Sequence, residues 1–342
     1  MPPGPWTPGG DTFLYCAYHV DHFPAAHGDS LGVDPDLLRG RNIGSDFSDK
    51  DGFNMYHGSE GVPGFPQHPH RGFETVTLMR QGLVDHADSM GCSARFGDGD
   101  TQWVTTGRGI MHSEMMPLLN RSGPNVYEGF QVWLNLPRRS KMSEPHFTMF
   151  WREHTPRVES VNEAGRRTQV TLVAGELSGR RALPPPPASW ASSAEADVAI
   201  MLIELLEAGA TFTLPPVATG SKARRQLYLH KGAGVTLDGV RIQGGSDVKV
   251  AIELSPTASV SFSATEGTAS LLLLQGAALG EPVAKYGPFV MNTREEIAQA
   301  FADFRSTQFG GWPHKDPAPV HARDQKRFAK HADGRTEHPE GK

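Results

Sequence analysis

The sequence is poor in features that mark several common protein classes. Only two of its 342 residues are cysteines, Cys16 and Cys92, and they form no CxxC pair. Two reduced thiols in a cytoplasmic protein are therefore expected, with a structural disulfide as the lesser alternative. No apolar run reaches the roughly 18 residues that a membrane-spanning helix needs, so no membrane segment is expected.

Positive charge and long helical patterns are also scarce. The formal net charge is −5 and the sequence pI is about 6.3. The overall charge therefore does not indicate binding to nucleic acid. The first residues lack a basic segment followed by an apolar one, so no secretory leader is expected. With 38 glycines and 27 prolines, the composition favours turns and short strands over long helices.

Strand-like segments occur in two sets, separated by a charged stretch at 137–165 that has the pattern of a connection. The first set comprises residues 73–78, 102–105 and 130–136. The second set comprises residues 169–174, 198–206, 211–214, 225–230, 246–254, 259–264 and 270–274. Short strands between glycine-rich turns predict antiparallel barrels or sandwiches.

One helix is predicted near the C-terminus, over residues 293–306. Thr293 and Glu296 have the spacing of a capping box. Four apolar residues then follow at helical spacing, Ile297, Ala300, Phe301 and Phe304. Beyond the helix, residues 313–342 form a polar tail of mixed charge, which predicts partial disorder, with a tail that wraps the surface as the alternative.

Two short motifs carry the chemistry. His68-Pro-His70 and His112-Ser-Glu114 each place two ligand-type side chains at positions i and i+2, which point to the same side of an extended strand. If the two strands are neighbours, three imidazoles and one carboxylate converge. This nitrogen and oxygen set suits Fe(II), Mn, Ni, Cu or Zn, and the lack of a thiolate argues against a closed structural zinc site.

The glycines near the second motif fit this arrangement, whereas the proline within the first motif fits it less well. Gly107 and Gly109 would let the chain turn tightly just before His112. Pro69 is a poor residue for a central strand, because it has no N–H to donate. We therefore expect it on an edge strand or at a bulge.

The wider sequence resembles the pirin family. The resemblance lies in residues 68–77 (HPHRGFETVT), 102–114 (QWVTTGRGIMHSE), 133–137 (WLNLP), 141–145 (KMSEP) and 287–297 (GPFVMNTREEI). It implies an all-β bicupin fold, with two cupin-type β-barrels and a short C-terminal helix. The expected N-terminal metal-binding barrel spans residues 1–150. The expected C-terminal barrel, without metal and including the helix, spans residues 151–312, and the polar tail spans residues 313–342.

The resemblance also implies the ligand set, which is His68, His70, His112 and Glu114. Glu74 is the competing carboxylate, because many other cupins carry a ligand at that spacing after HxH; we expect it to be structural or to contact the ligands. His230, in the second barrel, is expected to be structural. The other histidines are expected at the surface or behind the ligands, with His57 and His86 the two closest to the motifs.

The activity implied is that of a metal-dependent dioxygenase that opens flavonols such as quercetin with O₂. Its cofactor would be one divalent metal, Fe(II) first, with Mn, Ni, Cu or Zn as alternatives. Glu114 could act as a general base toward the substrate hydroxyl. Arg71 could face an anion or form a surface salt bridge. The alternative function is a non-enzymatic, iron-binding, redox-sensitive regulator that acts through protein partners.

Overall fold

The computed structural model describes residues 10–56, 61–245 and 250–339. Within them the chain divides into two compact units, one of residues 15–154 with 281–339 and one of residues 10–14 with 155–280. We expected residues 151–312 to form a single second part. The structure instead places the segment from residue 281 onward with the first unit, where its helix and strands find their contacts.

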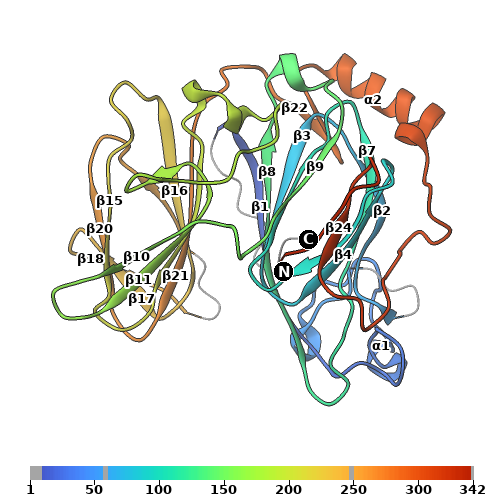
Figure 1. Cartoon of the computed structure of the whole chain (residues 1–342), viewed down its shortest axis with the longest axis horizontal. Coiled ribbons are helices and arrows are strands. Elements are labelled where there is room, and N and C mark those ends of the chain that lie inside the picture. Colours follow the sequence, from blue (N-terminus) through green and yellow to red (C-terminus); the bar gives the residue numbers. More distant parts are fainter. Residues whose placement is uncertain (1–9, 57–60, 246–249, 340–342) are drawn as a thin grey trace. The chain divides into compact units, whose positions relative to one another are not determined.

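The first unit is built from two antiparallel sheets (Figure 1). In sheet order, the five-stranded sheet contains β1 (Phe13–Phe23), β8 (Asn125–Asn135), β3 (Phe73–Gln81), β6 (Thr101–Thr105) and β9 (His146–Phe150). The six-stranded sheet contains β2 (Gly64–His70), β7 (Ile110–Met115), β4 (Leu83–Asp88), β5 (Ser93–Gly97), β24 (Phe328–Lys330) and β25 (Thr336–Glu337). A small two-stranded sheet joins β22 (Ala284–Tyr286) to β23 (Phe289–Met291).

The second unit is also built from antiparallel strands. Its six-stranded sheet contains β10 (Arg157–Val161), β11 (Arg167–Ala174), β14 (Ala199–Leu205), β21 (Ala269–Ala277), β16 (Ala223–Lys231) and β19 (Val250–Leu254). Its four-stranded sheet contains β15 (Thr211–Leu214), β20 (Val260–Ala264), β17 (Gly234–Leu237) and β18 (Val240–Gln243). A separate hairpin pairs β12 (Glu176–Leu177) with β13 (Arg180–Arg181).

Most predicted strands are confirmed, because apolar and β-branched residues alternate or run continuously through them. Of the segment predicted at 246–254, residues 246–249 lie outside the described residues. The prediction of a plain connection at 137–165 is wrong, since β9 and β10 lie within it. Strand β1 was also missed, because its Tyr, His and Asp residues obscure a buried face formed by its Phe and Ala residues.

The predicted helix is confirmed as α2 (Arg294–Thr307), orange in Figure 1. Its capping box is present: the Thr293 hydroxyl accepts from the Glu296 N–H, and the Glu296 carboxylate accepts from the Thr293 N–H. Its apolar face packs on Phe289 of β23, which explains why the helix belongs to the first unit. No helix in the described part of the chain is both long and apolar enough to cross a membrane.

The remaining helical segments are short. They are α1 (Pro35–Leu38) and the 3₁₀ turns η1 (Lys50–Gly52), η3 (Arg138–Ser140), η4 (Trp190–Ser192), η5 (Ala194–Ala196) and η6 (Gln308–Gly310). The two cores are therefore formed by strands. The core of the first unit is rich in Phe and Met, and that of the second unit is rich in Leu.

The described part of the polar tail, residues 313–339, lies along the first unit, as in the alternative of a tail that wraps the surface. Strand β24, dark red in Figure 1, pairs with β5 and extends the six-stranded sheet. The buried Arg95 guanidinium holds the tail by donating to the carbonyls of His321, Ala322 and Gln325. The same guanidinium forms two 2.7 Å hydrogen bonds with the Asp85 carboxylate.

This buried pair generates a stability prediction. Replacing Arg95→Met should destabilise the first unit by roughly 3–5 kcal/mol, because Asp85 would be left buried without a counter-charge. Urea unfolding of the metal-free protein, together with hydrogen exchange at Phe328–Lys330, measures the effect. The matched control is Arg335→Met, whose exposed pair with Glu337 should contribute less than about 1 kcal/mol. Equal effects of the two substitutions would contradict this account of the tail.

Candidate metal centre

Strands β2 and β7 place the two motifs side by side. They pair in antiparallel register, with His68 opposite His112 and His70 opposite Ile110. Strand β2 lies at the edge of its sheet and its register shifts between Phe65 and His68, so Pro69 is accommodated as expected, on an edge strand beside a bulge. The predicted neighbour relationship between the two motifs is therefore confirmed.

Three imidazoles converge at this register. One ring nitrogen from each of His68, His70 and His112 lies within 4.8 Å of the others. Their ring centroids are 4.4–4.9 Å apart. In the described part of the chain, this is the group of His, Cys, Asp and Glu side chains whose spacing could hold a metal ion.

Hydrogen bonds orient these rings toward a common point. The Nδ1 atoms of His68 and His70 lie 2.7 and 3.4 Å from the carbonyl oxygens of Pro66 and Pro288. A carbonyl only accepts, so each Nδ1 carries the proton and each Nε2 is left with a lone pair for a metal. Among the described residues, neither nitrogen of the fully buried His112 has a hydrogen-bond partner, which is costly unless a ligand occupies one of them. These three residues therefore fit a metal ion.

Burial also keeps the three rings in the form that binds a metal. It lowers the pKa of His68, and it lowers the pKa values of His70 and His112 well below the usual imidazole range. Neighbouring imidazoles add to the effect at His70 and His112, because two cationic rings would repel each other. The rings are thus neutral at neutral pH, as metal coordination requires.

Glu114 lies beside the three histidines and is braced on both carboxylate oxygens. Its Oε2 is 3.8 Å from His112 Nε2 and accepts a 2.9 Å hydrogen bond from the Gln131 amide; its Oε1 accepts one of 3.2 Å from Thr77. The indole N–H of Trp133 donates to Gln131 Oε1, which fixes the amide orientation. The role of Glu114 as fourth ligand stays a prediction. Sequence reasoning missed Gln131, whose signal is a polar residue at i−2 from Trp133 within the apolar stretch of residues 130–134.

Glu74 lies away from the three histidines. Phe73 contacts His70 and Thr77 contacts Glu114, so the odd-numbered residues of β3 face the site. Successive side chains of a strand alternate, and Glu74 therefore faces the other side, where it accepts a 2.6 Å hydrogen bond from Thr105. This geometry favours Glu114 over Glu74.

The remaining histidines divide as follows. His86 is fully buried, with its ring 5.6 Å from that of His112 and its Nε2 3.2 Å from the Asp88 carboxylate. It therefore lies directly behind a proposed ligand. His57 lies outside the described residues, and His230 is buried in β16 of the second unit.

Arg71 forms a salt bridge, but not the surface one that was the second of its two expected roles. It is buried, with its guanidinium 2.7 Å from the Asp303 carboxylate of α2 and stacked over the Phe309 ring. Next to it, Gly72 has φ +85°, and a Cβ there would come within 1.9 Å of the Val290 carbonyl oxygen. The turn after the first ligand pair is thus held tightly against β23.

Two family models match the chain: "Pirin" over residues 38–134 and "Pirin C-terminal cupin domain" over residues 202–310. The chain belongs to the pirin family. Its two cupin domains and predominantly β structure agree with the predicted bicupin fold.

Similar proteins come from plants and bacteria. A pirin-like protein of Solanum lycopersicum is 34% identical over 249 residues, which cover 71% of this chain and 75% of the relative. A pirin-like protein of Caulobacter vibrioides is 35% identical over 266 residues, which cover 76% of this chain and 85% of the relative. The crystal structure of a quercetin 2,3-dioxygenase from Acinetobacter baumannii aligns with a TM-score of 0.65 at 28% identity, covering 88% of this chain and 86% of that one.

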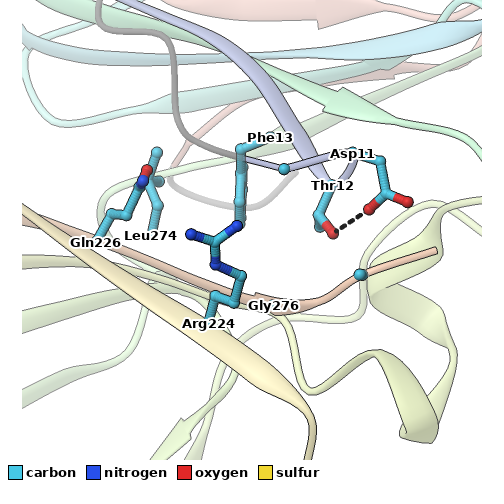
Figure 2. Close-up of a pocket in the computed structure, with 9 residues that line it drawn as sticks. Asp11, Thr12, Phe13, Arg224, Gln226, Leu274 and Gly276 are labelled. Atoms are coloured by element: carbon cyan, nitrogen blue, oxygen red, sulfur yellow. Dashed lines mark hydrogen bonds between the residues drawn. The ribbon is translucent and has the colours of Figure 1, made fainter. Parts of the chain in front are cut away.

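The second unit contains a hollow of about 270 Å³ between residues 10–13 and strands β16 and β21 (Figure 2). Its charged groups are already engaged. Arg224 pairs with Glu253 at 2.7 Å, and the Asp11 carboxylate accepts from the backbone N–H groups of Leu279 and Gly280. None of the described residues that line it is a histidine or a cysteine. This hollow therefore offers no donor set comparable to the three histidines.

The site predicts a loss of metal on changing one imidazole. His112→Ala should take the metal content of the purified protein from near one ion per chain to near none, because two imidazoles are left without the third. Elemental analysis measures this. His146→Ala, which removes an exposed imidazole at the start of β9, is the control and should change nothing. Full metal retention in His112→Ala would show that the assignment is wrong.

A matched pair of substitutions tests the fourth ligand. Glu114→Gln should weaken metal binding, since it removes the negative charge beside the imidazoles. Glu74→Gln should leave metal binding unchanged, because it keeps the acceptor for Thr105 and lies on the other face. Competition against a chelator gives the two affinities. If Glu74→Gln weakened metal binding and Glu114→Gln did not, Glu74 would be the ligand and Glu114 would not.

Proposed function

We propose that this chain is a metal-dependent dioxygenase that opens flavonols such as quercetin with O₂. The observation that carries the proposal is the convergence of three neutral imidazoles within 4.8 Å, with a braced carboxylate 3.8 Å from one of them. The name of the A. baumannii structure, quercetin 2,3-dioxygenase, supports the choice of reaction.

His68, His70 and His112 would hold the ion, with Glu114 as the fourth ligand. We place Fe(II) first, with Mn, Ni, Cu or Zn as alternatives, because nitrogen and oxygen donors without thiolate suit all of them. When bound, the ion supplies Lewis-acid activation of the flavonol and a place for O₂ chemistry. The chain's own residues then have to position the substrate and move its proton.

Glu114 is the residue placed to take that proton. Thr77 and Gln131 each donate to one of its oxygens, and both interactions favour an accepting carboxylate. The Trp133–Gln131–Glu114 chain of hydrogen bonds leaves the carboxylate little freedom to rotate. Oε2, the oxygen nearer His112, is the atom that we expect to accept the proton of the flavonol hydroxyl.

The proposal predicts oxygen consumption by the loaded enzyme. Protein loaded anaerobically with Fe(II) and mixed with quercetin should consume O₂ and bleach the flavonol absorption band when air is admitted. Glu114→Gln should lower the rate per bound metal by roughly 10²–10⁴-fold, the usual contribution of a general base. Absence of turnover with all five metals, at normal metal content, would exclude the dioxygenase and leave the regulator as the function of the same site.

A further inference from the structure

Next to the metal centre, three side chains from different strands form an aromatic and cationic cluster. Tyr15 of β1 lies against Trp133 of β8, with ring centroids 4.9 Å apart. The ammonium group of Lys285, on β22, lies 4.9 Å from the Trp133 ring centroid and 5.5 Å from that of Tyr15. We call Tyr15, Trp133 and Lys285 the recognition face.

The recognition face joins an exposed residue to a buried proposed ligand through ring contacts. Lys285 is exposed, Tyr15 and Trp133 are half-buried, and His70 is 4% exposed. The Trp133 ring contacts the His70 ring edge-on, with centroids 5.4 Å apart. A planar molecule that approaches the histidines along this face would therefore meet the cation first and the indole next.

Among the described residues, the partners of the Lys285 cation are aromatic rings and not carboxylates. In the part of the chain that the structure describes, Lys285 makes no salt bridge or hydrogen bond through its ammonium group. Two aromatic rings stabilise its charge through cation–π contact but offer no oxygen to accept its N–H groups. Partial burial lowers the pKa of Lys285, and no neighbouring charge contributes to the shift. An anionic oxygen on a bound molecule would replace the solvent around this exposed ammonium group with a charged acceptor.

The rings beside it also have a fixed orientation. Trp133 donates its N–H to Gln131 and packs on Phe73, with ring centroids 4.3 Å apart. Both contacts hold the indole in one position, so its exposed part can contact a ligand at little entropic cost. Because Gln131 also braces Glu114, the same indole links the recognition face to the proposed general base.

We propose that the recognition face selects planar aromatic substrates that carry an anionic oxygen, carboxylate or phenolate, at the end remote from the metal-binding group. The rings of Tyr15 and Trp133 contact the aromatic plane, and Lys285 donates to the remote anion. This inference rests on the proposed function, because it takes the substrate of the metal centre to be aromatic. Lys285 thereby becomes a specificity residue for the proposed reaction.

The experiment compares two ligands that share one metal-binding head. The probes are 3-hydroxyflavone, which has no remote anion, and 3-hydroxyflavone-4′-carboxylate. Both are titrated under anaerobic conditions into metal-loaded wild-type protein, so that binding is read without turnover. We expect the carboxylate to bind about tenfold more tightly, as for a charge-assisted hydrogen bond on a partly exposed site.

Variants then assign the preference to one side chain. Lys285→Met should lose the preference and leave the affinity for 3-hydroxyflavone and the metal content unchanged, whereas Lys285→Arg should keep it. Lys222→Met, an equal change of charge at an exposed lysine of the second unit, should bind both probes as the wild type does. The proposal would be overturned if the wild type bound both probes equally, or if Lys285→Met still preferred the carboxylate. It would also be overturned if Lys285→Met lost the same affinity for both probes.

An aerobic arm separates this inference from the proposed function. Charge-selective binding by wild type without any turnover of either probe would refute the dioxygenase and support the recognition face. Turnover of both probes by wild type and Lys285→Met at the same ratio of kcat/KM would support the dioxygenase and refute the role of Lys285.

Discussion

The antiparallel register between β2 and β7 is the constraint on which the site depends. It sets His68 opposite His112, and the i, i+2 geometry of each strand then brings His70 to the same side. A slip of one residue would turn the side chains of one strand to the other face and separate the imidazoles. The bulge before His68 and the tight turn at Gly72 fix this register from both ends of β2.

Elements distant in sequence hold that register in place. Pro317 of the tail accepts a hydrogen bond from the Gln67 N–H, directly before His68, and His314 reaches the carbonyl of Asp88 behind His112. Arg95 and Asp85 anchor the following stretch of the tail. The C-terminal tail is therefore part of the ligand-bearing sheet, although its composition is that of a disordered segment.

The sequence predicted the parts of the site that follow from local geometry. The ligand pairs needed only the alternation of side chains along a strand, and helix α2 needed only its capping box and apolar spacing. The recognition face and the tail depend on pairings between segments more than 100 residues apart, and the brace on Glu114 depends on contacts with Gln131 and Thr77 on two other strands. No local pattern encodes those pairings: Lys285 resembles any exposed lysine until β22 brings it over Trp133. Strand β1 was missed for another reason, because its Tyr and His residues, which are half-buried or exposed, interrupt its apolar pattern.

X-ray absorption spectroscopy of the metal-loaded protein tests the central claim most directly, since it reports the donors around the ion. The account predicts three imidazole nitrogens together with oxygen donors that include one carboxylate, and a change in the oxygen shell alone in Glu114→Gln. A sulfur donor, or a spectrum with at most one imidazole, would contradict the assignment of the metal to His68, His70 and His112.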